Sequence, residues 1–443
     1  MMNGILSDIA RKQKNVPAGM VSVCSSNSFA IRAAMKSALD RNLPVLIEAT
    51  ANQVDQNGGY SGMKPADFSS FVLSLAREAG FPQAAVILGG DHLGPLTRRH
   101  LGEDEAMEYA ETLVREYASA GFNKIHLDTS MRLADDPVDK PLPVSEIAKR
   151  GARLCRAAEE SFADYQKKHP GSSSPLYVIG SEVPIPGGAQ SCDDSVKLTS
   201  PDDCRETYDT YRSVFRKHGL DDAFSRVIAL VVQTGAEFGD DKIFEYDREK
   251  NAALVEYGRV HLPIVFEGHS TDYQSVESLK TMVQDGIAIL KVGPALTFAF
   301  REALFALESI EREVYNGSSW KASNFGEVLE LVMLDNPGYW QNHYLGDAWS
   351  QRFARRYSFS DRARYYLGVP AVSQAINCLA QNINAIDVPR SLLSQYMPRE
   401  LNEMIKSGRI FGFEDLILTH IGFDLDRYYK AILPESQSVV GDE

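Results

Sequence analysis

The sequence predicts an α/β fold, a TIM (β/α)8 barrel with an appended C-terminal helical subdomain, and two observations support this prediction. Eight short apolar runs alternate with helical patterns between residues 20 and 292, and eight such alternations is the strand count of this barrel. The runs are rich in β-branched residues and almost continuously apolar, which is typical of parallel strands covered on both faces. The alternation alone leaves an open, doubly wound sheet as the alternative fold.

The predicted strands and helices follow one another in a regular order. The apolar runs lie at residues 20–24, 44–49, 86–89, 124–127, 176–180, 227–232, 263–266 and 287–292. Helical spacing of apolar residues appears at 30–40, 66–78, 103–120, 148–167, 200–217 and 252–257. After Pro294 the pattern changes to helices and loops alone. We therefore predict a barrel domain over residues 1–296 and a helical extension, packed on the barrel, over residues 297–443.

Composition and charge argue against several classes of protein. The chain has 443 residues, and its 46 Lys and Arg against 60 Asp and Glu give a net charge of −14. That balance argues against binding to nucleic acid or an anionic membrane, although a small anionic substrate depends only on the local field of its pocket. We expect neither a membrane span nor a secretory leader. Five scattered cysteines are typical of reduced thiols, so a cytoplasmic location is expected.

Polar residues stand at the ends of most of the predicted strands. In a TIM barrel, the strand ends and the loops that follow them carry the active site. The residues at these positions are Asp91, His92, His126, Asp128, Glu182, Gln233, Glu237, Glu267, His269 and Lys291. Because the loops meet at one mouth of the barrel, these imidazoles and carboxylates would converge. Such a set suits a divalent metal ion with an open coordination position.

Some of these residues also have a structural interpretation. His126 lies inside a predicted strand, where a hydrogen-bonded core histidine and a functional one fit the sequence equally well. Asp128 could instead cap the next helix. The arginine cluster within residues 352–364 suits either a solvated surface or a phosphate contact. The sequence contains no G-x-x-x-x-G-K-[ST], no G-x-G-x-x-G after a strand and no G-x-S-x-G, so it predicts no nucleotide-binding loop and no nucleophile elbow.

Long motifs connect the sequence with a known family. The predicted third strand, VILGGDHLGP, resembles the V-I-L-H-x-D-H strand of class II, metal-dependent fructose and tagatose bisphosphate aldolases. The whole chain is similar to the accessory, or Z, subunits of tagatose-bisphosphate aldolases. Shared motifs include LIEATANQVDQNGGYSGMKPADF, GFNKIHLDTSM, EGHSTDYQ and AILKVGPALTFAFREALFAL. They extend from about residue 20 to about residue 400, so the resemblance covers almost the entire chain.

The resemblance implies roles in catalysis and metal binding. Asp91 matches the catalytic acid/base of the aldolases, and His92 and His269 match metal-ligating histidines. Glu237 stands near the position where the aldolases have a further histidine, and oxygen in place of nitrogen puts the choice of metal in question. The implied cofactor is a divalent metal ion, with zinc expected first and magnesium, manganese and nickel as alternatives. A further ligand or acid/base is expected from Glu182 and Asp128.

Substrate-binding residues are also implied. We expect Ser25, Asn52 and Gln53 to bind sugar hydroxyls. We expect Ser270, Thr271, Lys291 and the backbone at Gly293 to bind phosphate, with Arg355 or Arg356 assisting from the extension. The loop reads GHSTD where the aldolases have HGGSG, which implies a different phosphate geometry.

The family resemblance leaves two main functions open. The first is a D-tagatose 6-phosphate 4-epimerase of galactitol and tagatose catabolism, which would cleave C3–C4 by a retro-aldol step, rotate the aldehyde and re-add it. That route needs a metal and a carboxylate base. The alternative is a non-catalytic accessory subunit of a class II D-tagatose-1,6-bisphosphate aldolase. A stand-alone aldolase and a kinase are further options. The expected partners are a phosphorylated ketose and an aldolase catalytic chain, and a homo-oligomer is left open.

Overall fold

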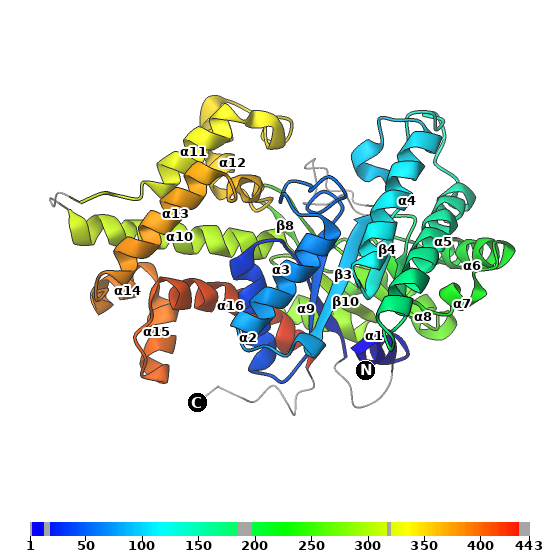
Figure 1. Cartoon of the computed structure of the whole chain (residues 1–443), viewed down its shortest axis with the longest axis horizontal. Coiled ribbons are helices and arrows are strands. Elements are labelled where there is room, and N and C mark those ends of the chain that lie inside the picture. Colours follow the sequence, from blue (N-terminus) through cyan, green and yellow to red (C-terminus); the bar gives the residue numbers. More distant parts are fainter. Residues whose placement is uncertain (1, 13–17, 184–196, 317–319, 434–443) are drawn as a thin grey trace.

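The computed structural model describes residues 2–12, 18–183, 197–316 and 320–433, and its centre is a closed barrel of parallel strands (Figure 1). Around the barrel the strand order is β1-β10-β9-β6-β5-β4-β3-β2. The strands are β1 (Met20–Cys24), β2 (Val45–Thr50), β3 (Val86–Leu93), β4 (Lys124–Leu127), β5 (Leu176–Ile179), β6 (Val227–Val232), β9 (Val265–Gly268) and β10 (Ile287–Val292). The predicted TIM barrel is confirmed, with one strand at each predicted run.

One strand is longer than the sequence predicts. β3 continues to Leu93, four residues beyond its expected end at Gly89. Glycine and polar residues in this stretch conceal the strand, because they break the apolar run that marks its first half. A second difference is a small antiparallel hairpin, β7 (Glu237–Phe238) with β8 (Ile243–Phe244), which lies outside the barrel sheet.

Helices follow the strands and cover the barrel. They are α2 (Ser28–Leu39), α3 (Pro65–Glu78), α4 (Glu103–Ser119), α5 (Val144–Lys168), α6 (Pro201–Lys217), α7 (Asp221–Phe224), α8 (Arg248–His261) and α9 (Val276–Gln284). Local capping fixes several of their starts. The Asn27 side chain accepts hydrogen bonds from two backbone N–H groups at the start of α2, and Ser200 forms a capping box before α6.

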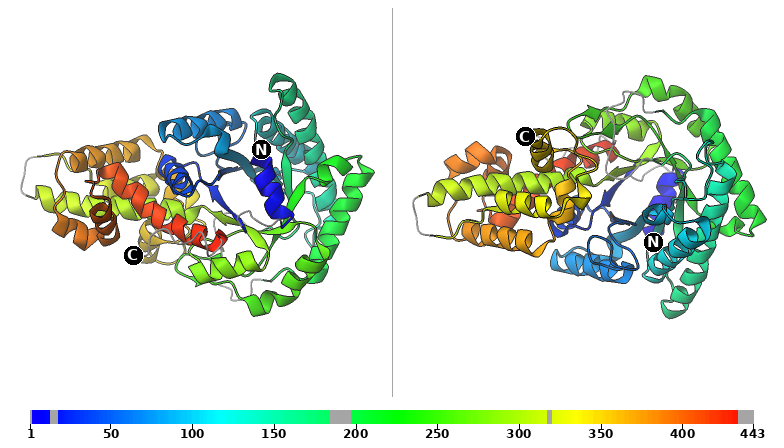
Figure 2. Two further views of the ribbon diagram at one scale, coloured as in Figure 1. Left: turned by 90° about the horizontal axis from the view of Figure 1, so that it is seen from below. Right: turned by 90° about the horizontal axis from the view of Figure 1, so that it is seen from above.

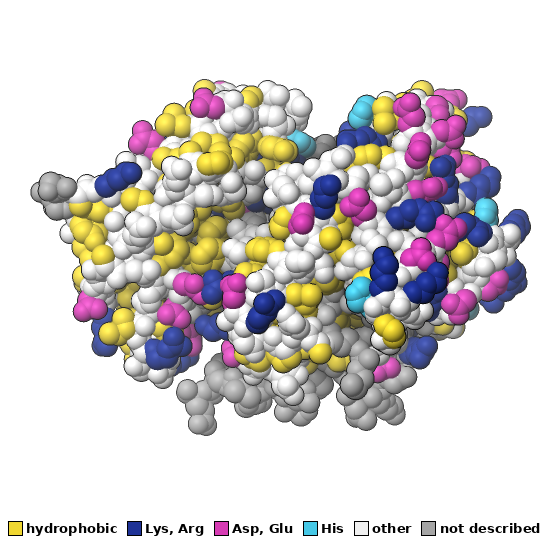
Figure 3. All heavy atoms as spheres, viewed as in Figure 1, with side chains coloured by type: hydrophobic (Ala, Val, Ile, Leu, Met, Phe, Trp, Pro, Cys, Tyr) yellow, Lys and Arg dark blue, Asp and Glu magenta, His cyan; other side chains and the backbone are white. Residues whose placement is uncertain are grey.

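The chain then leaves the barrel and forms a helical extension on one side of it (Figures 1 and 2). Its helices are α10 (Pro294–Tyr315), α11 (Phe325–Asp335), α12 (Ala348–Tyr357), α13 (Pro370–Asn384), α14 (Arg390–Tyr396) and α15 (Pro398–Ser407), with a 3-10 turn, η4, at Arg362–Tyr366. In Figure 3, apolar side chains gather over this extension, whereas charged side chains are denser on the opposite side of the barrel.

The last helix returns to the barrel. α16 (Phe413–Ile432) packs against α2 and α9, and the Tyr428 hydroxyl donates to Thr271 O at 2.7 Å. Residues 413–432 therefore complete the ring of helices, and the extension is an excursion between the last strand and the last helix. The predicted domain boundary after residue 296 stays a prediction about where independent folding units divide.

The opposite end of the chain covers the bottom of the barrel. α1 (Met2–Ala10) lies across the amino ends of the strands (Figure 2). Its Leu6 and Ile9 are buried against Met20, Leu46 and Ile228. This packing excludes water from the end of the barrel that lies away from the predicted site.

No helix within the described parts of the chain is long and apolar enough to cross a membrane. The described cysteines, Cys24, Cys155, Cys204 and Cys378, are free thiols. Cys192 lies outside the described residues.

Candidate active site

Asp91 and His92 lie at the end of β3, where the strand departs from regular geometry. The register with β4 shifts at this point, and His92 has a φ of 49°, which is uncommon for a residue other than glycine. A Cβ at Gly89 would lie 2.6 Å from Glu48 Cγ, so glycine allows β3 to pass this close to β2. Backbone strain of this kind clusters at functional sites, and here it falls on His92, a predicted site residue.

Three imidazoles converge beside Asp91. They belong to His92, to His126 of β4, and to His269 directly after β9. The ring centroids of His92 and His269 are 4.9 Å apart, and His126 lies 5.3 Å from each of the others. His126 Nδ1 is 2.9 Å from Asp91 Oδ1, whereas its Nε2 is buried without a hydrogen-bond partner among the described residues. An orphaned buried nitrogen is costly unless something binds it.

His92 has the environment of a metal-binding histidine. Its Nδ1 lies 2.8 Å from Asp128 Oδ2. A carboxylate behind one ring nitrogen orients the imidazole and leaves the other nitrogen for an ion. Burial lowers the pKa of His92, but Asp91 and Asp128 raise it by more. These carboxylates favour the protonated ring, so a cation at Nε2 would compete with a proton.

The protonation states of Asp91 and His269 suit a base and a ligand. Burial, together with the positive charge of Lys291, lowers the pKa of His269 to about 3, so its imidazole is neutral. Burial alone would raise the pKa of Asp91, but the charges of His92 and Lys291 hold it well below its ordinary value. Ligand atoms of Asp91, His126, Glu267 and His269 all lie within 4.8 Å of one another. This buried His/Asp/Glu cluster could hold a metal ion.

Next to this cluster, the barrel interior carries charges where aliphatic side chains usually lie. Lys124 Nζ is 2.7 Å from Glu48 Oε1 and 2.7 Å from Glu267 Oε2. Lys291 Nζ is 3.5 Å from a carboxylate oxygen of each of these residues, and it forms a closer ion pair with Asp91. Buried charges are tolerated only when they are paired. The network satisfies this condition and fixes the Lys291 ammonium against Asp91.

A cavity of about 710 Å³ opens beside the cluster, between the barrel and the extension. Asp91, His92 and His269 line it from the barrel, and Arg364 and Tyr365 line it from the extension. Small-molecule sites typically have volumes of about 300–1,000 Å³ and combine apolar walls with a few polar groups. The cavity is therefore large enough for a sugar phosphate.

The start of α10 faces the same cavity, but its amides are already bound. Asp272 Oδ1 accepts hydrogen bonds from Gly293 N at 3.0 Å and from Ala295 N at 2.8 Å. The loop after the eighth strand is a frequent phosphate site in TIM barrels. Here a carboxylate takes the place that an anion would have at these two amides.

Comparison with known proteins identifies the family. Residues 5–433 match the family described as D-tagatose-1,6-bisphosphate aldolase subunit GatZ/KbaZ-like. The chain belongs to this family. A solved structure described as a probable tagatose 6 phosphate kinase from Sinorhizobium meliloti 1021 is 39% identical, with a TM-score of 0.83. The match covers 93% of this chain and 100% of that chain, so the resemblance seen in the sequence is confirmed.

Two further solved structures are more distant from this GatZ/KbaZ-like chain. The YdjI aldolase from Escherichia coli K12 is 14% identical, with a TM-score of 0.39, and the match covers 85% of this chain and 98% of that one. A fructose-bisphosphate aldolase from Campylobacter jejuni is 15% identical, with a TM-score of 0.41, covering 84% and 91%. Likeness at this level does not bear on the chemistry of the site.

Most of the site residues predicted for this GatZ/KbaZ-like chain lie together. Those that line the cavity are Ser25, Asn52, Gln53, Asp91, His92, His269, Ser270, Lys291 and Gly293. Two more lie directly behind the lining. Asp128 contacts His92, and Thr271 donates its hydroxyl hydrogen bond to Lys291 O at 2.7 Å.

The other four predicted residues also lie outside the cavity lining. Glu182 forms an ion pair with Lys197 at 3.3 Å. Glu237 is buried on β7, where burial raises its pKa to about 7. Arg355 pairs with Glu330 at 2.6 Å, and the Arg356 guanidinium donates to Gly326 O at 3.0 Å. Their proposed roles in the site stay predictions.

The role of His126 could not be decided from the sequence, and Lys124 and Glu48 were not predicted as site residues. A signal for two of them is present in β4, because Lys124, His126 and Asp128 stand at alternate positions. Side chains at alternate positions of a strand share one face. In a strand expected to be buried on both sides, such polar residues mark the face toward the barrel axis. Of the arginines in residues 352–364, Arg364 lines the cavity.

Proposed function

We propose that this protein is a metal-dependent enzyme that interconverts D-tagatose 6-phosphate and D-fructose 6-phosphate. It would invert C4 by retro-aldol cleavage of C3–C4 and re-addition. The observation that carries this proposal is the meeting of three buried imidazoles and the ionised Asp91, of which Asp91, His92 and His269 line one cavity. A scaffold has no need of such a cluster, whose charges are costly to bury.

The cluster fits a divalent metal ion. His92, His126 and His269 would hold it, because His126 Nε2 is a buried nitrogen with no partner in the described part of the chain and His269 is neutral. Neutral imidazoles suit zinc first, while magnesium, manganese and nickel remain to be compared. When bound, such an ion would polarise the C2 carbonyl and stabilise the negative charge of the enediolate. Glu237 stays a prediction as a ligand.

Asp91 is the proposed base. Its carboxylate lines the cavity and is held between His126 and the Lys291 ammonium. Ionised, it can take the C4-hydroxyl proton while the C3–C4 bond breaks and the electron pair of that bond passes to the enediolate. Return of a proton during re-addition completes the reaction without an oxidant or a reductant.

Arg364 is the proposed phosphate ligand. Two cationic side chains line the cavity among the described residues, Lys291 and Arg364. Lys291 faces carboxylates, whereas the Arg364 guanidinium donates to the carbonyls of Ser360 and Asp361 and to the Tyr365 hydroxyl. Within the described chain it has no carboxylate ion-pair partner. A guanidinium that lacks a counter-ion in a cavity suits a phosphate monoester.

The decisive experiment uses the full chain alone. Metal-free protein is supplied with one divalent metal at a time and with D-fructose 6-phosphate, without ATP or a partner protein. Formation of D-tagatose 6-phosphate, followed by NMR, is the expected result. The Asp91→Asn variant is the control for contaminating activity. No conversion with any of the metals would contradict the proposal.

The second candidate is an accessory subunit of a D-tagatose-1,6-bisphosphate aldolase, and the family description favours it. This role needs a partner chain but not an intact metal cluster. It would be supported if the wild-type protein and the Asp91→Asn variant both raise the activity or stability of a catalytic aldolase chain equally, while neither turns over the monophosphate.

A further inference from the structure

Epimerisation at C4 needs one more proton-transfer group than simple aldol cleavage does. The following inference rests on the proposed function. Cleavage places the C4 oxygen near one acid/base group. After the aldehyde has rotated, its oxygen points to the opposite side when C3–C4 forms again. A single carboxylate cannot serve both positions, so a second proton donor is needed on another wall of the cavity.

Most titratable side chains that line the cavity already have another role or a partner. Asp91 is the proposed base, and His92 and His269 are proposed metal ligands. Lys291 pairs with Asp91, and Cys24 Sγ lies 3.9 Å from Asp91 Oδ2, so both approach from the wall that Asp91 occupies.

The remaining candidates lie nearer the extension. Asp272 caps the start of α10 with its Oδ1. Arg364 stays protonated and cannot act as an acid. Tyr365 accepts a hydrogen bond from Arg364 at 2.9 Å, which places its hydroxyl at the proposed phosphate ligand. Tyr60 is the remaining phenol among the described residues that line the cavity, and the Asp272 carboxyl, unlike it, is already tied to the backbone at the start of α10.

We propose that Tyr60 is the second catalytic acid/base, acting on the C4 oxygen after the aldehyde has rotated. Tyr60 lines the cavity from the loop after β2. The edge-to-face contact of its ring with Tyr365, with centroids 4.7 Å apart, sets it on the wall formed with the extension. The side chains of Gln53 and Ser26 interact with its hydroxyl and partly offset the effect of burial on its pKa.

The loop that carries Tyr60 holds it in place. Tyr60 N donates to Asn52 O at 3.0 Å. The preceding Gly59 has a φ of 56°, and a Cβ there would lie 2.4 Å from Gln53 O. Glycine is therefore required for this turn. Burial raises the pKa of Tyr60 to about 12, which keeps the phenol protonated and ready to donate.

The proton balance closes over one turnover. Asp91 gains the C4-hydroxyl proton as C3–C4 breaks. Tyr60 gives its proton to the aldehyde oxygen as C3–C4 forms on the other face, leaving a tyrosinate and a protonated Asp91. After product release, exchange with solvent water returns one proton to Tyr60 and removes one from Asp91. The reverse reaction uses the two groups in the opposite order.

The test compares Tyr60→Phe with Tyr357→Phe, since each removes one phenol hydroxyl but Tyr357 is exposed and lies outside the cavity lining. Tyr60→Phe should lower epimerisation at least about a hundredfold. It should still cleave one of the two epimers, the one whose C4 hydroxyl faces Asp91. Hydrazine would trap the glyceraldehyde 3-phosphate released. Tyr357→Phe should keep epimerisation, and both variants should keep wild-type zinc affinity and melting temperature.

Two results would overturn the assignment while the proposed function stands. One is wild-type epimerisation by Tyr60→Phe, and the other is loss of cleavage of both epimers in that variant despite unchanged metal binding. A wild-type protein that turns over neither epimer overturns the proposed function, and this inference with it.

Discussion

At the residue scale, the most specific prediction about the reaction concerns Asp91. Asp91→Asn keeps the size of the side chain but removes the proton acceptor, so kcat for epimerisation should fall about 10²–10⁴-fold. Circular dichroism and thermal melting should show a folded protein. Turnover within tenfold of wild type would mean that another group removes the C4-hydroxyl proton.

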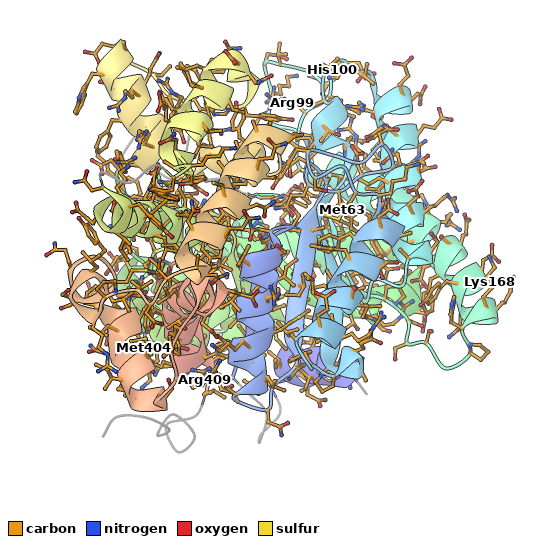
Figure 4. All side chains as sticks on the ribbon, turned by 60° about the vertical axis from the view of Figure 1, so that its left-hand side comes forward. Met63, Arg99, His100, Lys168, Met404 and Arg409 are labelled. Carbon is orange, nitrogen blue, oxygen red and sulfur yellow. The ribbon has the colours of Figure 1, made fainter. Side chains whose placement is uncertain are left out.

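His126 carries a prediction about metal binding that does not depend on activity. Its Nε2 is buried and has no partner within the residues that the structure describes. His126→Asn should therefore weaken zinc binding by at least about a hundredfold, since loss of an outer-shell partner alone costs about 10–100-fold. Isothermal titration calorimetry would measure the change. His100→Asn is the matched control, because His100 is exposed at the upper end of the molecule in Figure 4. Equal affinities of the two variants would exclude His126 as a ligand.

Part of the site could be predicted from the sequence, residue by residue. Asp91, His92 and His269 could be predicted because motifs carry them at strand ends. His126 could not be decided, because a core histidine and a ligand look the same until the neighbouring side chains are known. Arg364 could not be separated from the other arginines of its cluster, because only the fold of the extension determines which of them faces the cavity.

At the scale of elements, His420 joins three C-terminal helices. On α16, it lies 2.6 Å from Glu400 of α15 and 3.6 Å from Glu302 of α10. Burial lowers the pKa of His420, but these carboxylates raise it overall to about 9. A raised pKa stabilises the folded protein below the ordinary value of about 6.5, and this contribution disappears as the pH rises through about 9.

His420→Gln should therefore lower the free energy of unfolding by about 2 kcal/mol at about pH 6 and have little effect near about pH 10. Urea denaturation at the two pH values would measure the difference. An effect of equal size at both values would show that packing, and not charge, makes the contribution.

The elements themselves were largely predictable. The bounds of β1, β4, β6 and β10 agree with the predicted runs, because buried parallel strands carry continuous apolar residues and end at polar ones. The last four residues of β3 could not be predicted as strand, because its glycines interrupt the apolar run. These glycines are present because β3 passes close to a neighbouring strand. The role of α16 was equally hidden, because nothing in an amphipathic pattern says which surface the helix will cover.

At the scale of the whole molecule, the metal site should contribute to stability. Its proposed ligands come from β3, β4 and the end of β9, and β3 and β9 stand on opposite sides of the closed barrel. An ion bound there would tie the two walls together. At a free concentration of about 100 Kd it would add about 2.7 kcal/mol to the free energy of unfolding.

Removing the metal with a chelator should therefore lower Tm by at least about 3 °C, and adding zinc back should restore it. Differential scanning calorimetry would show both changes, and His126→Asn should show a much smaller response. An unchanged Tm after complete metal removal would argue against a site that bridges the barrel.

The sequence by itself determined the barrel class, the order of its strands and helices, and the motif residues at the strand ends, because these depend on local periodicity and on short segments. Tertiary structure alone decided which residues meet. Closing the barrel brings Asp91, His126 and His269 together, and the extension brings Arg364 to the same cavity. Such contacts join residues far apart in the chain, and their geometry depends on how the strands close and how the helices pack, which no local pattern encodes.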